Sequence, residues 1–175
     1  MRGDRLPDLI HIPRTAGTAL AQALHGAVTR HGHTVTLASL PPDARAIAFL
    51  RDPVARFVSA WDFAHDANER NRDGYFRLGY PTAEELALAL DPDVMAQEVF
   101  RPQVSWVPDL TDARLLFVGR TEHLYRDFLR ACDLLGLSGR SLPAYVPPTR
   151  SQLSAGAIVS LLGFYREDVE LLSWS

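Results

Sequence analysis

A ten-residue stretch at residues 11–20, HIPRTAGTAL, is the feature that most constrains the fold. It follows the short apolar run of residues 9–10 and opens a segment whose apolar residues repeat with helical spacing. We therefore predict a strand, a tight turn and the start of a helix. The turn carries Arg14, two threonines and a glycine. Because a helix N-terminus presents unpaired N–H groups and arginine adds a fork of donors, this loop is predicted to hold a phosphate or sulfate group.

A second junction of the same kind follows at residues 46–61. The continuous apolar run at 46–50 is typical of a strand buried on both faces of a parallel sheet. Asp52 as N-cap and Pro53 as first helical residue predict a helix directly after it, with Arg51 at the junction. Open α/β folds bind ligands at the carboxyl ends of their parallel strands, so we expect both junctions to converge at that edge.

Arg51 and Ser59 form a second candidate anion site. They lie eight residues apart in the sequence. This spacing corresponds to roughly 10 Å along a helix axis, so a long arginine can meet the serine over one small anion. Arg120 and Arg150, near a predicted strand end and in a connecting loop, are further candidates for anion contacts. Simpler interpretations fit the same residues: an ordinary strand-to-helix turn with a surface arginine, and a helix-start arginine followed by a neutral serine.

The composition, with 175 residues of which 47% are apolar and 22% charged, is ordinary for a single globular domain. The net charge of −3 argues against a general nucleic-acid binder, so any anionic ligand must be held by a local cluster. The only cysteine, Cys132, excludes an intrachain disulfide and a cysteine-based zinc site. Neither a membrane span nor a signal-peptide segment is found, and we expect a cytoplasmic protein.

Apolar periodicity and capping signals predict the remaining elements. We expect helices over residues 18–30, 82–90, 94–100, 122–135 and 155–172, and strands over residues 34–38 and 114–119. The capping box from Thr82 to Glu85 and the N-cap Ser154 mark two of these helix starts. We interpret the polar stretch 68–80 as a loop or lid over the site.

Two histidines, His31 and His33, flank Gly32 at the start of the predicted strand 34–38. A metal site is not expected there, because no third ligand is placed nearby. A histidine just off a strand edge is a candidate general base. His11, at the end of the first predicted strand, is more typical of a packed histidine than of a catalytic one.

Taken together, these motifs resemble the sulfotransferases that use 3′-phosphoadenosine 5′-phosphosulfate (PAPS), in the carbohydrate-type and bacterial branch that includes heparan sulfate 2-O-sulfotransferase. The stretch 11–20 is similar to the family's 5′-phosphosulfate loop, usually PKTGGT, and residues 50–61, LRDPVARFVSAW, closely resemble its 3′-phosphate motif. Residues 117–128 are similar to a later family segment and residues 165–172 to the family's usual last helix. The His-Gly-His at 31–33 resembles the Gly-His that precedes the second strand in this branch. The resemblance covers most of the chain and implies an α/β single domain with a P-loop-kinase-like parallel sheet flanked by helices.

The resemblance also implies residue roles. Arg14 stands at the position of the family's lysine, which contacts the 5′-phosphosulfate. Donors to the same group would come from Thr15, Ala16, Gly17, Thr18 and Ala19. Arg51 and Ser59 would hold the 3′-phosphate, and His33 matches the histidine assigned as catalytic base, with His31 beside it.

Two departures from the family pattern concern the loop. Arg14 replaces lysine, so it can bind the same oxygens but cannot donate a proton to the leaving phosphate. Ala16 replaces the first loop glycine, and we predict that the turn avoids a positive φ there. The chain is short for the family, so we assign the whole of residues 1–175 to one sulfotransferase domain. We expect an open acceptor site, formed by residues 62–110 as the acceptor side or lid, or by a partner subunit.

The expected reaction is in-line transfer of a sulfuryl group from PAPS to the hydroxyl group of a small-molecule or carbohydrate acceptor, with no metal required. A P-loop-like kinase using ATP is an alternative, although the loop lacks the Walker A spacing. A non-catalytic nucleotide-binding protein is a third interpretation.

Overall fold

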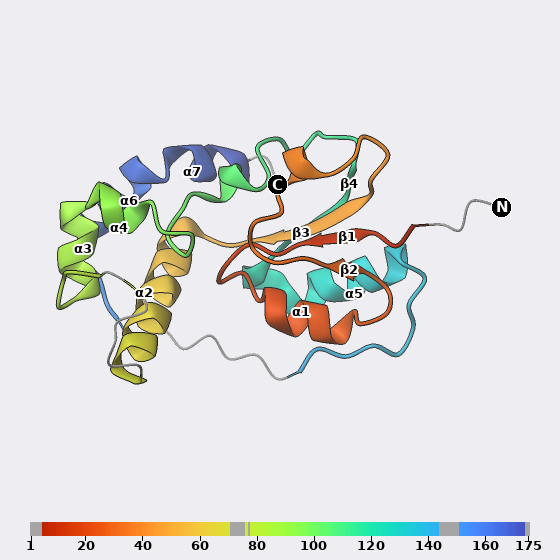
Figure 1. The fold of residues 1–175 in the computed structure, drawn as a ribbon, viewed down its shortest axis with the longest axis horizontal. Coiled ribbons are helices and arrows are strands. Elements are labelled where there is room, and N and C mark those ends of the chain that lie inside the picture. The colour runs from red at the N-terminus through yellow and green to blue at the C-terminus, as the bar shows by residue number, and fades with distance from the viewer. Residues whose placement is uncertain (1–4, 71–75, 77, 144–150, 174–175) are drawn as a thin grey trace. The chain divides into compact units, whose positions relative to one another are not determined.

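Four parallel strands form the sheet of this protein, whose computed structural model describes residues 5–70, 76, 78–143 and 151–173. The strands are β1 (Asp8–Ile10), β2 (Thr29–Arg30), β3 (Ala46–Leu50) and β4 (Leu115–Arg120), in the order β2-β1-β3-β4. Each neighbouring pair is parallel (Figure 1). Every residue of β3 is buried, as its continuous apolar run predicts. The predicted α/β class, a parallel sheet flanked by helices, is confirmed.

The chain divides into two compact units, and the sheet belongs to the first, which contains the described residues 5–51 and 103–143. Helices α1 (Gly17–Ala23) and α5 (Leu124–Leu134) cover one face of the sheet (Figure 1). Their buried side chains, among them Leu20 and Phe128, pack with Ile47 and Phe49 of β3. Short 3₁₀ helices η1 (Leu37–Ser39), η2 (Gln103–Ser105) and η3 (Thr121–His123) complete this unit.

The region between α1 and β3 differs from the prediction. The helix expected over 18–30 ends at Ala23, because Gly26 (φ 78°) turns the chain back toward the sheet. Thr29 then pairs with Asp8 of β1, so the second strand is at 29–30 and the predicted strand at 34–38 is wrong. Residues 37–39 instead form η1, since the side chains of Thr36 and Ser39 bond to each other's backbone N–H groups and so satisfy the backbone locally.

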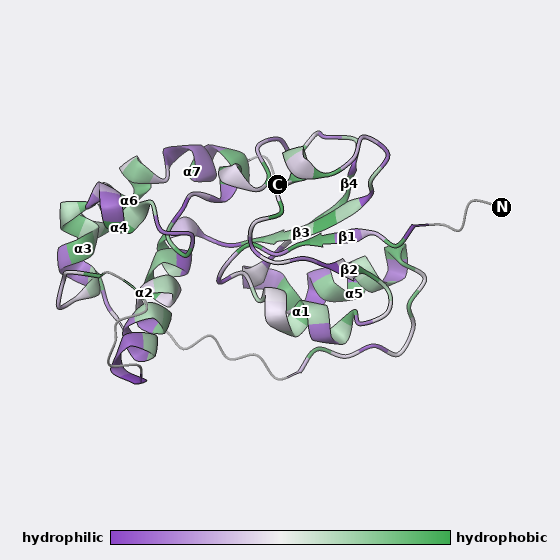
Figure 2. Ribbon diagram, in the orientation of Figure 1, coloured by the Kyte–Doolittle hydropathy of each residue, from purple (hydrophilic) through white to green (hydrophobic). Residues whose placement is uncertain are grey.

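The second unit contains the described residues 52–70, 76, 78–102 and 151–173 and is helical. Its helices are α2 (Pro53–Arg70), α3 (Ala83–Ala89), α4 (Pro92–Met95), α6 (Ala155–Phe164) and α7 (Arg166–Ser173). The predicted helix starts are confirmed: Asp52 caps α2, the capping box of Thr82 and Glu85 opens α3, and Ser154 caps α6. Helix α6 contributes Ala157 and Leu161 to the buried core of this unit, and Figure 2 shows that α2 carries both hydrophobic and hydrophilic residues.

Other boundaries in the second unit were predicted wrongly. Residues 68–70 belong to α2 rather than to a loop, and the helix expected over 94–100 is the single turn α4. The last helix is broken into α6 and α7 at Tyr165, whose buried hydroxyl donates to the carbonyl of Phe100 at 2.5 Å. Part of the proposed lid over 68–80, residues 71–75 and 77, lies outside the described residues.

The guanidinium of Arg56 organises the interior of the second unit. This side chain of α2 is fully buried and donates to the carbonyls of Val99 (3.2 Å), Phe100 (3.3 Å) and Arg101 (2.5 Å). The ring of Tyr165 lies over the same guanidinium, 5.5 Å from ring centroid to Cζ. Burial raises the pKa of Tyr165, so its hydroxyl stays protonated and remains a donor. None of the helices in the described part of the chain is long and apolar enough to cross a membrane.

Candidate functional site

The loop between β1 and α1 holds two non-glycine residues in the left-handed region. Arg14 has φ 67° and Ala16, the N-cap of α1, has φ 65°. The prediction that Ala16 avoids a positive φ is therefore wrong. Such a conformation costs of the order of 1–3 kcal/mol per residue and persists only where surrounding structure enforces it. One such restraint is the buried hydroxyl of Thr15, which donates to the carbonyl of Ile12 at 3.0 Å.

The helix that follows this loop is short. Helix α1 has seven residues, so its dipole adds little charge, and an anion here depends on Arg14 and on individual N–H groups. The N-cap Ala16 provides no capping side chain for the first turn. The first-turn residues Gly17, Thr18 and Ala19 thus present their backbone N–H groups at the start of α1, and Thr18 is exposed.

Arg51 joins the two strand-to-helix junctions. Its buried guanidinium donates from Nη1 to the carbonyl of Arg14 at 3.2 Å. The side-chain amide of Gln103 holds the backbone of Arg51 on both sides: Oε1 accepts from the Arg51 N–H at 2.9 Å, and Nε2 donates to its carbonyl at 2.8 Å. The two junctions therefore meet at the carboxyl edge of the sheet, as predicted. Gln103 was missed because it lies in an irregular stretch without any motif.

The ring of His33 is held so that one nitrogen is available. Its Nδ1 lies 2.7 Å from the carbonyl oxygen of His11. A carbonyl oxygen only accepts hydrogen bonds, so Nδ1 carries the proton, and in the neutral ring Nε2 keeps its lone pair. The indole of Trp106 donates to the carbonyl of His33 at 2.5 Å and fixes the backbone at the same residue. Trp106 was also missed, because nothing local to residues 102–112 connects it with residue 33.

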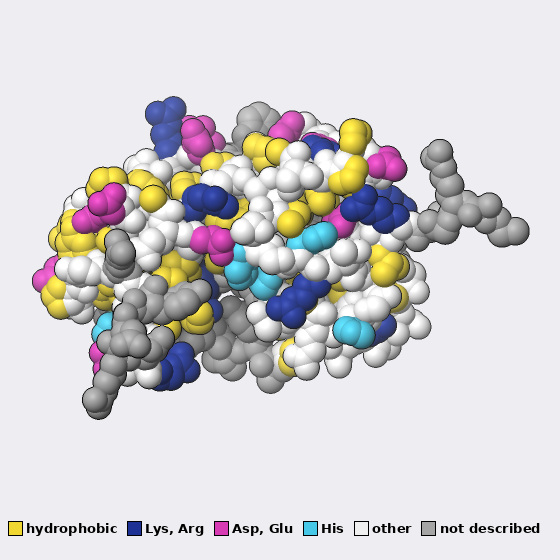
Figure 3. Space-filling view, viewed as in Figure 1, with side chains coloured by type: hydrophobic (Ala, Val, Ile, Leu, Met, Phe, Trp, Pro, Cys, Tyr) yellow, Lys and Arg dark blue, Asp and Glu magenta, His cyan; other side chains and the backbone are white. Residues whose placement is uncertain are grey.

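His11 lies between the loop and His33. Its ring centroid is 4.1 Å from that of His33, at an interplanar angle of 51°. On its other side the His11 ring occupies the space where a side chain on Gly17 would be. Burial, and to a smaller extent electrostatic interaction with His33 and Arg30, lowers the pKa of His11 to about 4. His11 is therefore neutral at pH 7. Figure 3 shows histidine side chains close together at the molecular surface.

His31 anchors the segment after β2. Its Nε2 lies 2.6 Å from Oδ1 of Asp8, a fully buried carboxylate of β1 that also pairs with Arg5 at 3.1 Å. His31 and His33 follow the carboxyl end of β2 rather than precede a strand, so their predicted position is wrong. The correction places them at the same edge of the parallel sheet as His11. Among the described residues, no group of three or more histidine, cysteine or acidic side chains is arranged to hold a metal ion.

The remaining predicted site residues are Ser59, Arg120 and Arg150. Ser59 is fully buried in α2, within the second unit. Arg120 pairs through Nε with Glu122 at 3.3 Å, while its backbone N–H donates to Asp127 at 2.9 Å. Arg150 lies outside the described residues. The pairing of Arg51 with Ser59 over one anion stays a prediction.

The chain is similar in structure to a solved sulfotransferase. No protein-family model matches the sequence, and no curated protein matches it. A sulfotransferase from Alicyclobacillus acidocaldarius, known from a crystal structure, is similar to this chain at a TM-score of 0.45 and 23% sequence identity. The match covers 76% of this chain and 54% of that protein, so the chain spans about half the length of the structure it matches.

Proposed function

We propose that this protein transfers a sulfuryl group from PAPS to a hydroxyl group of an acceptor. The observation that carries the proposal is the ring of His33. Its Nδ1 is engaged by a carbonyl, which leaves Nε2 to act as a base. The same ring lies against His11, the first residue of a loop that contains Arg14 and is linked to Arg51. A base next to a cationic loop is the arrangement that group transfer from an anionic donor requires.

The donor is held in two places in this proposal. Arg14 and the loop residues bind the 5′-phosphosulfate, through donors of Thr15, Ala16, Gly17, Thr18 and Ala19. The hydroxyl of Thr15 already donates a hydrogen bond to the carbonyl of Ile12. In this proposal Thr15 therefore binds through its backbone N–H, and Thr18 supplies the hydroxyl group. Arg51 and Ser59 hold the 3′-phosphate, and Arg150 contributes a further contact. The motif resemblance at residues 11–20 and 50–61 supports these assignments.

The reaction proceeds by in-line displacement. The acceptor oxygen bonds to sulfur while the bond between sulfur and the bridging phosphate oxygen breaks, and adenosine 3′,5′-diphosphate leaves. Nε2 of His33 accepts the proton of the acceptor hydroxyl. Arg14 offsets the negative charge that grows on the bridging oxygen but donates no proton to it, because its guanidinium remains charged. No step of this scheme needs a metal ion.

The acceptor would be a small molecule or a carbohydrate. We assign its binding to residues 62–110, and we treat residues 1–175 as one catalytic domain. The described part of 62–110 contains the end of α2 together with α3 and α4, and α3 lies where a helix was predicted.

Labelled PAPS and a panel of hydroxyl acceptors test this proposal. In His33→Ala we expect kcat to fall by about 10²–10⁴-fold, because a general base is lost. The Kd for adenosine 3′,5′-diphosphate should stay nearly unchanged. His25→Ala, at an exposed histidine of the same unit, is the matched control and should keep full activity. Wild-type turnover in His33→Ala would remove His33 from this role. A larger thermal shift with ATP–Mg²⁺ than with adenosine 3′,5′-diphosphate would contradict the sulfotransferase assignment.

A further inference from the structure

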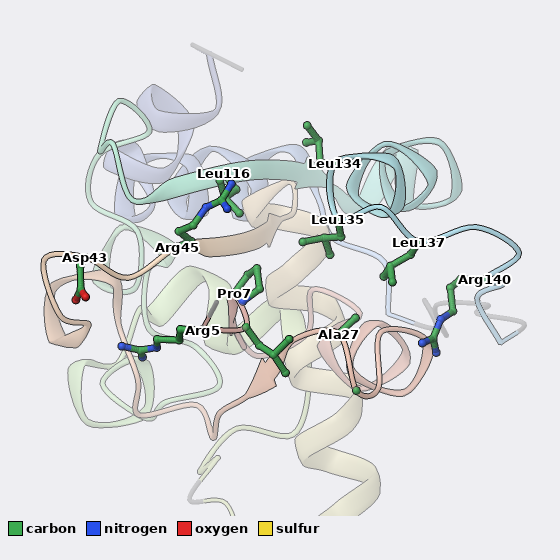
Figure 4. Close-up of a pocket in the computed structure, with 12 residues that line it drawn as sticks. Arg5, Pro7, Ala27, Asp43, Arg45, Leu116, Leu134, Leu135, Leu137 and Arg140 are labelled. Atoms are coloured by element: carbon green, nitrogen blue, oxygen red, sulfur yellow. The ribbon is translucent and has the colours of Figure 1, made fainter. Parts of the chain in front are cut away.

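A groove of about 580 Å³ lies at the opposite, amino-terminal edge of the sheet in the first unit (Figure 4). Its walls come from the segments before β1 and β3, the turn after α1, and the end of α5 with the residues that follow it. Because parallel strands all point the same way, this edge lies at the far end of the strands from the histidine cluster. The groove is therefore separate from the proposed transfer site.

Two arginines give the groove its charge. Arg45 is exposed, and its side chain makes no hydrogen bond or ion pair with another described residue, while its carbonyl accepts from the N–H of Asp8 at 2.7 Å. Arg140 donates from Nη1 to the carbonyl of Ala23 at 3.3 Å, which leaves the rest of its donor fork available. Arg5 also lines the groove but is neutralised by Asp8, which accepts from Nη2 with both oxygens. Among the described residues that line the groove Asp43 is the only acidic one, so the groove attracts anions although the chain as a whole has a charge of −3.

Between these cations the wall is apolar. In Figure 4 the side chains of Pro7, Leu135 and Leu137 lie between Arg45 and Arg140. Leu134, another lining residue, is 61% exposed. An apolar surface left open in a concave site gains free energy when a ligand covers it, by about 25 cal/mol for each Å² buried.

We propose that this groove binds an amphipathic organic anion, a carboxylate, sulfate or phosphate carried on an alkyl or aryl body. The leucines contact the apolar body, and Arg45 or Arg140 donates to the anionic group. A volume of about 580 Å³ lies within the range of small-molecule sites, and a hollow suits a single molecule better than the flat surface of a membrane. A free inorganic anion would leave the leucines exposed.

Isothermal titration with three simple probes tests this inference. Octanoate has both parts of the proposed ligand, acetate lacks the apolar body, and octylamine carries the opposite charge. We expect octanoate to bind at least about tenfold more tightly than the other two. Arg45→Ala should weaken octanoate binding about tenfold, as for loss of one charge-assisted hydrogen bond. Leu134→Glu should also weaken it, since the new carboxylate repels the ligand.

The matched control is Arg130→Ala. This exposed arginine of α5 has the same charge, makes only a 3.8 Å contact with Asp127 and does not line the groove, so octanoate affinity should not change. Equal octanoate affinity in wild type and Arg45→Ala would overturn the inference, as would equal affinities for octanoate and acetate. Co-sedimentation with phosphatidylglycerol vesicles that depends on Arg45, without binding of free octanoate, would identify a membrane surface instead. Binding of adenosine 3′,5′-diphosphate should be the same in all these variants, so the result is independent of the proposed function.

Discussion

Replacement of Gly17 by alanine tests whether the His11 ring is wedged between the loop and His33. The added methyl group would overlap Cδ2 and Nε2 of His11 and lie 2.9 Å from Cγ. Carbon atoms in contact are about 3.5 Å apart, so the ring must move by roughly 1 Å or more. Overpacking of this kind costs about 1–3 kcal/mol, and a severe overlap with a buried ring belongs at the upper end. The higher helix propensity of alanine than of glycine offsets about 1 kcal/mol of this loss in unfolding free energy.

The net expectation for Gly17→Ala is a loss of about 2 kcal/mol of unfolding free energy, or roughly 4–8 °C in Tm for a chain of this size. Thermal and urea unfolding measure it. Gly32→Ala is the control from the same neighbourhood: no atom lies within 4 Å of its added methyl group and its φ is not positive, so its stability should be unchanged or slightly higher. Equal Tm values for the two variants would refute the wedged position of His11.

Three further predictions concern buried polar groups. Because the pKa of His11 is lowered to about 4, the unfolded chain takes up a proton below about pH 6.5 that the folded chain does not. Stability should therefore fall as pH decreases from 6.5 to 4, by at most about 1.4 kcal/mol per pH unit, and urea titrations should show a smaller loss in His11→Phe. Gln103→Leu leaves the buried N–H and carbonyl of Arg51 without their partners. We expect a loss of about 2 kcal/mol in urea unfolding and weaker binding of adenosine 3′,5′-diphosphate, and unchanged affinity would contradict the positioning of Arg51. Arg56→Leu removes the donors to three carbonyls and should destabilise the fold by at least about 3 kcal/mol, and a Tm within 2 °C of wild type would contradict that estimate.

The elements that the sequence predicted well have strong local signals. Strand β3 is a continuous apolar run, and the starts of α2 and α3 are set by caps whose donors and acceptors lie within three residues. Such contacts form between neighbours along the chain, so they can be recognised without knowledge of the tertiary structure.

Strand β2 shows what local signals omit. It has only two residues, and its existence depends on pairing with β1 after the turn at Gly26. The alternating residues at 34–38 have better strand propensity, but no strand of the described residues pairs with them. The capping interactions of Thr36 and Ser39 form a 3₁₀ turn there instead of a strand. The same error placed His31 and His33 before a strand instead of after one.

The candidate site was predicted in part. The meeting of Arg14 and Arg51 followed from the rule that parallel strands end at one edge. The supports from Gln103 and Trp106 could not be anticipated, because each acts on a residue 52 or 73 positions away. The positive φ of Ala16 was missed for a related reason: the strain is tolerated only because the surrounding structure holds the loop.

A crystal structure of the protein with adenosine 3′,5′-diphosphate tests the central claim most directly. The proposal predicts the 5′-phosphate within hydrogen-bonding distance of Arg14 and of the backbone N–H groups of residues 17–19. It predicts the 3′-phosphate on Arg51 and Ser59, and an open path from the 5′-phosphate to Nε2 of His33. A nucleotide bound with its phosphates away from residues 13–19, or with the 3′-phosphate in that loop, would contradict it.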